Sequence, residues 1–134
     1  MNRSLSELFL SSMLFRQTGV PAAPEDIREA EELLSLRFSP EYAAYLAAWG
    51  GAAFGDHSLT GLGTADDLDV VTATLEARLF HSAVPSSWYA IERVGSQGIV
   101  VWQDFTGTVY WSQPGRAPYP LCSSLAVYLE PAES

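Results

Sequence analysis

The sequence predicts an α+β fold in which a central antiparallel sheet, a meander of three strands, packs with N-terminal helices and a C-terminal helix. Apolar residues recur at helical spacing in the first 80 residues, whereas 88–94, 99–103 and 108–111 are rich in β-branched and aromatic residues. Helices followed by a run of strands are typical of the α+β class. The 134 residues are enough for a single domain over 1–134 with one core.

The first predicted helix covers residues 5–16, where Leu5, Leu8 and Phe9 share one face. The segment Thr18-Gly19-Val20-Pro21 then ends the helical pattern.

The second predicted helix begins at Pro24 and runs to about Ser35, because proline suits the first helical position. Its expected buried stripe consists of Ile27, Ala30, Leu33 and Leu34. At 100° per residue, three glutamates fall within an arc of roughly 60° on the side away from that stripe. We call these residues the acidic ridge: Glu25, Glu29 and Glu32.

A third helix is predicted to start after Ser39, as its N-cap, and to end at Gly50-Gly51. Its buried face should consist of Tyr42, Tyr45, Leu46 and Trp49. The glycine-punctuated residues 52–64 predict a loop with one short strand.

A fourth helix should follow three aspartates, Asp66, Asp67 and Asp69, which suit the positive end of a helix. Its expected apolar face is Val71, Leu75 and Leu79, at i, i+4 and i+8. After the meander, the prolines of 114–120 predict a stiff connection, and Ser123 or Ser124 can cap a last helix that carries Leu125, Tyr128 and Leu129.

Candidate chemistry is sparse. His57 lies between Asp56 and Ser58, which permits a triad interpretation, but in a glycine-rich loop a turn held by the aspartate side chain is favoured. His81 is predicted to be an exposed helix end, and Cys122 a small buried side chain.

Three aspartates before the fourth helix raise the possibility of a metal site. Asp66, Asp67 and Asp69 lack the further acids of a calcium loop, so helix capping is the preferred interpretation. No catalytic residue, cofactor or metal is predicted, and the protein is not expected to be an enzyme. The tryptophans of the meander, Trp88, Trp102 and Trp111, are expected to pack, with a ligand-stacking platform as the alternative.

Net charge restricts the partners. Sixteen acids oppose seven arginines, there is no lysine, and the formal charge is −9. Residues 25–76 alone carry eleven acids against two arginines. Such a protein repels phosphate backbones and anionic lipids, so neither nucleic acid nor a membrane surface is an expected partner. The apolar stretch 8–15 is far shorter than the ~20 residues of a membrane span. Acids and arginines interrupt any export signal, and a cytoplasmic location is expected.

The order of these segments resembles a known family. Residues 18–52, TGVPAAPEDIREAEELLSLRFSPEYAAYLAAWGGA, look like the opening of the SUKH superfamily. LTGLGT (59–64), DVVTATLEARLF (69–80) and IVVWQDFTGTVYWSQPG (99–115) match its later parts, and the final SSLAVYL resembles its closing helix, with Leu125 where an aromatic residue is common. The resemblance covers about 18–130. This superfamily joins bacterial immunity proteins to the yeast Smi/Knr cell-wall-synthesis regulators and the Syd proteins.

The resemblance implies an α+β protein-binding fold without an established catalytic centre. Many bacterial members bind and neutralise toxins, often nucleases, so the expected partner is a cognate toxin, with a basic nuclease domain as one possibility. A basic toxin surface suits an acidic contact surface, for which the candidates are the acidic ridge and Asp56, Asp66, Asp67 and Asp69. The alternatives are a solvated acidic surface, a regulatory or scaffolding role, and small-molecule binding on the aromatic sheet. A monomer is favoured.

Overall fold

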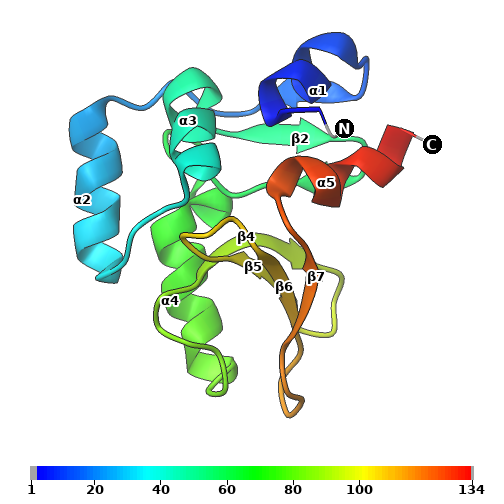
Figure 1. The fold of residues 1–134 in the computed structure, drawn as a ribbon. Coiled ribbons are helices and arrows are strands. Elements are labelled where there is room, and N and C mark those ends of the chain that lie inside the picture. Colours follow the sequence, from blue (N-terminus) through cyan, green and yellow to red (C-terminus); the bar gives the residue numbers. More distant parts are fainter. Residues whose placement is uncertain (1–2, 134) are drawn as a thin grey trace.

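The computed structural model describes residues 3–133, which fold into two antiparallel sheets surrounded by helices (Figure 1). A small sheet has the strand order β1-β2-β3, and a larger one the order β4-β5-β6-β7. This architecture confirms the α+β prediction.

The N-terminal segment differs from the predicted helix over 5–16. Helix α1 (Leu5–Ser11) ends early, because Ser12 is extended, and strand β1 (Phe15–Gln17) pairs with β2 (Ala52–Phe54). Phe15 stacks on Phe9, with ring centroids 4.6 Å apart. Sheet pairing together with this aromatic contact replaces the last helical turn.

Helices α2 (Pro24–Leu34) and α3 (Pro40–Trp49) begin and end as predicted. Ser35 ends α2 in the left-handed conformation, and Ser39 caps α3 by accepting from the backbone N–H of Tyr42. The predicted stripe of α2 is wrong at Leu33, which is 60% exposed. On α3 the tyrosines and Leu46 are buried, but Trp49 is only half-buried.

Residues 52–64, predicted to hold one short strand, hold two, β2 and β3 (His57–Ser58), which pair in the small sheet. The short 3₁₀ helix η1 (Asp66–Leu68) then leads into α4 (Val70–Phe80). The predicted apolar face of α4 is wrong: Leu75 is 46% exposed and Leu79 is 77% exposed. The face that the sheet covers consists instead of Val70, Ala73, Thr74 and Ala77. These small side chains let the helix lie close to the sheet, which leaves the bulkier leucines outside.

The larger sheet contains the three predicted strands, β4 (Tyr89–Val94), β5 (Ile99–Gln103) and β6 (Val109–Ser112), and a fourth, β7 (Tyr119–Cys122). The expected stiff connection therefore contains a strand. Its proline is tolerated because β7 lies at the sheet edge, where a missing N–H breaks no ladder.

Helix α5 (Leu125–Leu129), which Ser124 caps as expected, and the 3₁₀ helix η2 (Glu130–Glu133) complete the described chain.

The larger sheet is covered on both faces. Tyr89, Ile91 and Val101 belong to the main core with α1, α3 and α5, whereas Ala90 and Trp102 belong to a second cluster with the alanines of α4. The indole N–H of Trp102 donates to Ser112 Oγ at 2.7 Å. Ser112 Oγ also lies 2.7 Å from Nδ1 of His81, which is only 6% exposed. The prediction that His81 is an exposed helix end is therefore wrong, because Ser112 gives this ring a buried partner.

Candidate protein-binding groove

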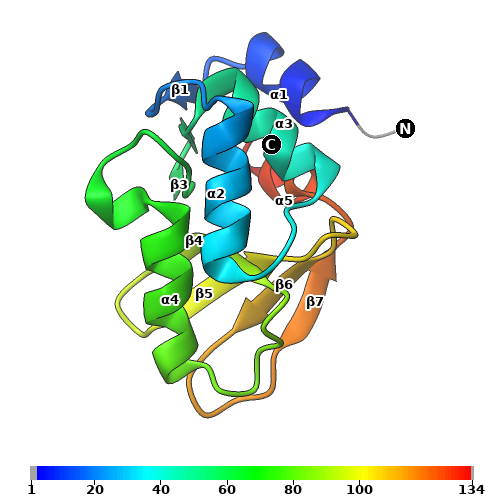
Figure 2. The ribbon, with the colours of Figure 1, turned by 90° about the vertical axis from the view of Figure 1, so that its left-hand side faces the viewer.

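Helices α2 and α4 lie side by side and run in the same direction on one face of the molecule (Figure 2). Between them is a groove of about 470 Å³, closed at one end by residues 20–22 and 62–63. We call it the α2–α4 groove.

Three glycine-containing segments meet at the closed end of the groove. A Cβ atom on Gly61 would lie 1.9 Å from the carbonyl oxygen of Gly50, and one on Gly50 would lie 2.0 Å from that of Val20. Gly50 also has a φ of +73°, which disfavours any side chain. The N–H of Leu62 donates to the Gly50 carbonyl at 2.8 Å. Direct backbone contact thus fixes Val20 and Leu62 in the groove wall.

The lining of the groove is largely apolar. Leu33 of α2 and Val71 of α4 both line it, with Val20 and Leu62 from the glycine-containing segments. Leu33 and Val20 are 60% and 65% exposed. Large apolar side chains gathered around a concave surface are typical of interaction sites.

Carboxylates surround this apolar lining. Asp26 and Glu29 come from α2, and Asp69 from the start of α4; of the described residues that line the groove, none is basic. Asp26 and Asp69 each use one oxygen to cap their helix, accepting from Ala23 N at 3.2 Å and Thr72 N at 2.9 Å. Within residues 3–133, no three His, Cys, Asp or Glu side chains form a group that could hold a metal ion.

The acidic ridge is exposed as predicted, but its members face different surfaces. Glu29 lines the α2–α4 groove, whereas Glu32 lines a shallow surface on the other side of α2, together with Arg28 and Arg37. Glu25 precedes Glu29 by one turn and points between the two surfaces. The ridge is therefore divided between a largely apolar groove whose charged lining residues are all acidic and a surface of mixed charge.

The predicted aspartates are also separated. Asp66 and Asp67 lie on η1 directly before Asp69, next to the groove. Asp56 lies in the turn between β2 and β3; a Cβ on the adjacent Gly55 would be 3.6 Å from Ala132 near the C-terminus. Figure 1 shows this end of β2 on the side of the molecule opposite α2.

Arg78 fixes helix α4 to the end of α2. Its guanidinium donates to the carbonyl of Leu34 at 3.2 Å and to that of Ser86 at 2.7 Å. Partial burial lowers the pKa of this guanidinium. Because the Leu34 carbonyl belongs to the last turn of α2, this contact holds the two helices that form the groove walls together.

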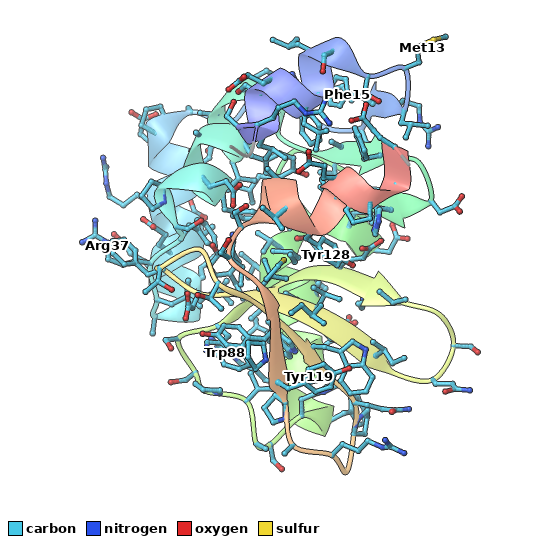
Figure 3. The ribbon with its side chains drawn as sticks, turned by 45° about the vertical axis from the view of Figure 1, so that its right-hand side comes forward. Met13, Phe15, Arg37, Trp88, Tyr119 and Tyr128 are labelled. Carbon is cyan, nitrogen blue, oxygen red and sulfur yellow. The ribbon has the colours of Figure 1, made fainter. Side chains whose placement is uncertain are left out.

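A buried polar cluster that the sequence did not predict centres on Glu92 of β4, which is 4% exposed. Its Oε1 lies 2.8 Å from His57 Nδ1 and accepts from Tyr128 Oη at 2.6 Å, and its Oε2 accepts from Ser58 N at 2.9 Å. Figure 3 shows Tyr128 on α5 above the sheet. The hydrogen bond to Glu92 raises the pKa of His57, and burial raises that of Tyr128.

The predicted turn is present at Asp56, between β2 and β3, and the ring of His57 that follows it bonds to Glu92. The partners of Glu92 are 34 to 36 positions away from it in the chain, so no local sequence pattern predicts the cluster. All the polar atoms named are paired, and the cluster joins β3, β4 and α5.

An exposed apolar groove lined in part by carboxylates is typical of interaction sites. The chain belongs to the SMI1-KNR4 cell-wall family SUKH_5, whose family model matches residues 1–130. This match confirms the resemblance to the SUKH superfamily, whose members in general interact with proteins. No curated protein matches the chain. Along residues 3–133, no helix has the length and apolarity needed to cross a membrane.

Proposed function

We propose that this protein is a non-enzymatic immunity protein that binds and neutralises a cognate bacterial toxin through its acidic surface. The observation that carries the proposal is the α2–α4 groove, an apolar surface with three carboxylates and no basic residue in its described lining. Membership of the SUKH_5 family supports a protein partner.

The charge favours a basic toxin domain such as a nuclease. A nuclease must bind phosphates and therefore presents a basic active site, which an acidic protein can cover. With a formal charge of −9, the protein also attracts such a partner over long distances, which speeds association. For a nuclease toxin we place this encounter in the cytoplasm.

The test is to express the toxin domain encoded beside this gene with and without the protein. We expect cell survival only with the protein, a stable purified complex, and association that slows as salt increases. The acidic-ridge variant Glu25→Lys/Glu29→Lys/Glu32→Lys should associate more slowly at low salt while its thermal stability changes little, since these side chains are exposed. Cell survival in the presence of the protein without any complex between the protein and the toxin domain would contradict the proposal.

A regulatory or scaffolding role is the second candidate, and the cell-wall description of the family favours it. A gene surrounded by housekeeping genes, and capture of a cell-wall-synthesis protein instead of a toxin, would support this role. Small-molecule binding is a third candidate: Trp111 on β6 stacks on the half-exposed Tyr119 on β7 with ring centroids 4.9 Å apart. Figure 3 labels Tyr119. A ligand that co-purifies with the protein would support it.

A further inference from the structure

We infer that the α2–α4 groove holds an amphipathic helix of the partner, with an apolar face against the groove and arginine or lysine along its flanks. The inference rests on the proposed function for the identity of that partner. It concerns a different question, which is where the partner docks and what chemistry its docking segment has.

The apolar side of this surface extends beyond the groove. Val71, Leu75 and Leu79 follow each other at i, i+4 and i+8 along α4, a row of about 12 Å. Val71 lines the groove and is half-buried, whereas Leu75 and Leu79 are 46% and 77% exposed. Leu33 on the neighbouring helix, which also lines the groove, is 60% exposed, so both helices that form the groove carry exposed leucines. Isolated exposed leucines need no explanation, but such a contiguous row marks an interaction site.

The geometry favours a helix as the occupant. Two adjacent helices leave a furrow into which the side chains of a third helix can pack. The exposed row on α4, at i, i+4 and i+8, is the kind of side-chain ridge that fits between the ridges of such a helix. An extended segment would instead need the free backbone groups of a sheet edge. The walls here are α2 and α4, whose backbone groups are bonded within their own helices except at the ends.

The charge selects a basic occupant. Asp26, Glu29 and Asp69 line the groove, and Asp66 and Asp67 lie on η1 next to Asp69. The one arginine recorded at η1 among residues 3–133, Arg93, already donates to the carbonyl of Asp67 and to Glu76. Arginines on the flanks of an incoming helix can reach these carboxylates while its apolar face covers Leu33 and Val71. A second copy of this chain does not fit, because two such surfaces would place carboxylates against carboxylates.

The groove is preformed in the structure without a partner. Arg78 joins α4 to the last turn of α2, and the backbone contacts of Gly50 and Gly61 hold the closed end. A preformed site loses little conformational entropy on binding. The docking helix can therefore bind as an isolated peptide.

The experiment uses ¹⁵N-labelled full-length protein and a synthetic 18-residue amphipathic peptide with leucines on one face and arginines on both flanks. A second peptide, with glutamate in place of every arginine, is its control. We expect saturable binding of the arginine peptide at 150 mM NaCl with a Kd below about 1 mM, and shifts of the amides of Ala30, Leu33, Val71 and Leu75. The glutamate peptide should not bind.

Matched variants locate the contact. Leu33→Ser/Leu75→Ser should raise the Kd of the arginine peptide at least tenfold. Leu121→Ser should leave that Kd unchanged, although Leu121 on β7 is 41% exposed and therefore comparable to Leu75. Unchanged far-UV circular dichroism shows that the variants remain folded. Absence of saturable binding, shifts centred on β6 and β7, or equal weakening by Leu121→Ser would overturn the inference.

The same variants separate this inference from toxin binding. If the toxin binds wild type and Leu33→Ser/Leu75→Ser equally, the groove assignment is wrong and the immunity function stands. If no toxin binds but the arginine peptide occupies the groove, the immunity function is wrong and the groove assignment stands.

Discussion

Glu41 connects the start of α3 to the start of α5, although 84 residues separate it from Leu125. Its Oε1 accepts from the N–H of Leu125 at 2.7 Å and from Nε2 of Gln103 at 2.9 Å, and its Oε2 accepts from the N–H of Ala126 at 3.1 Å. Helix α5 has only five residues, too few to be stable alone. We expect replacement of Glu41 by alanine to destabilise the fold substantially.

The magnitude follows from the three hydrogen bonds. A bond to a charged group contributes about 1.5–3 kcal/mol, but part is recovered where water reaches the freed donors. Since Glu41 is half-buried, we expect Glu41→Ala to lower the free energy of unfolding by about 3 kcal/mol. That corresponds to roughly 10 °C in Tm for a chain of this size. Glu41→Gln keeps one acceptor oxygen and should cost about half as much.

Urea unfolding, followed by tryptophan fluorescence and circular dichroism, measures this loss. The matched control is Glu25→Ala, which removes a glutamate one residue after a helix-starting proline, as Glu41→Ala does, but at an exposed position. The control should change stability by less than about 0.5 kcal/mol. A Glu41→Ala variant within that range, or a control of equal cost, would refute the reasoning.

Three further predictions test the core and its buried polar groups. Trp102→Ala should cost about 3–5 kcal/mol in urea unfolding, and Trp49→Ala less, because only Trp102 is fully buried; equal costs contradict this assignment. Gly61→Ala should lower Tm, since its Cβ would lie 1.9 Å from a carbonyl oxygen; an unchanged Tm argues against the glycine contact. The raised pKa of His57 beside Glu92 predicts a stabilisation that is complete below about pH 6.5 and is lost as pH rises through the folded-state pKa. A His57→Gln variant with the same pH profile of unfolding would exclude that pairing.

Local patterns were sufficient to predict α3 from the sequence. Ser39 followed by Pro40 marks its start, and Gly50 marks its end. The effect of each of these residues on the helix is confined to the neighbouring one or two turns, so it can be recognised from the sequence. The strands β4 to β6 were predictable for the same reason, because runs of β-branched and aromatic residues and the glycines between them are local features. The observed elements agree with these signals.

Features that depend on tertiary contacts were not predictable in this way. The spacing of Leu75 and Leu79 indicated a buried face for α4, but periodicity gives no information about which face meets the sheet. Strand β7 was hidden by its proline, Pro120, which only an edge position permits. The groove brings Glu29 and Asp69 together from separate helices, a proximity that no local pattern contains.

The packing of α4 explains why the fold leaves this surface for a partner. Ala73 and Ala77 lie against the cluster around Trp102, and because they are small, the helix approaches the sheet closely. The leucines on its other side, Leu75 and Leu79, have no core to enter and stay exposed, as Leu33 of α2 does. Core and docking surface therefore occupy separate faces of one helix. Substitutions on the outer face can change the choice of partner without creating a cavity in the core.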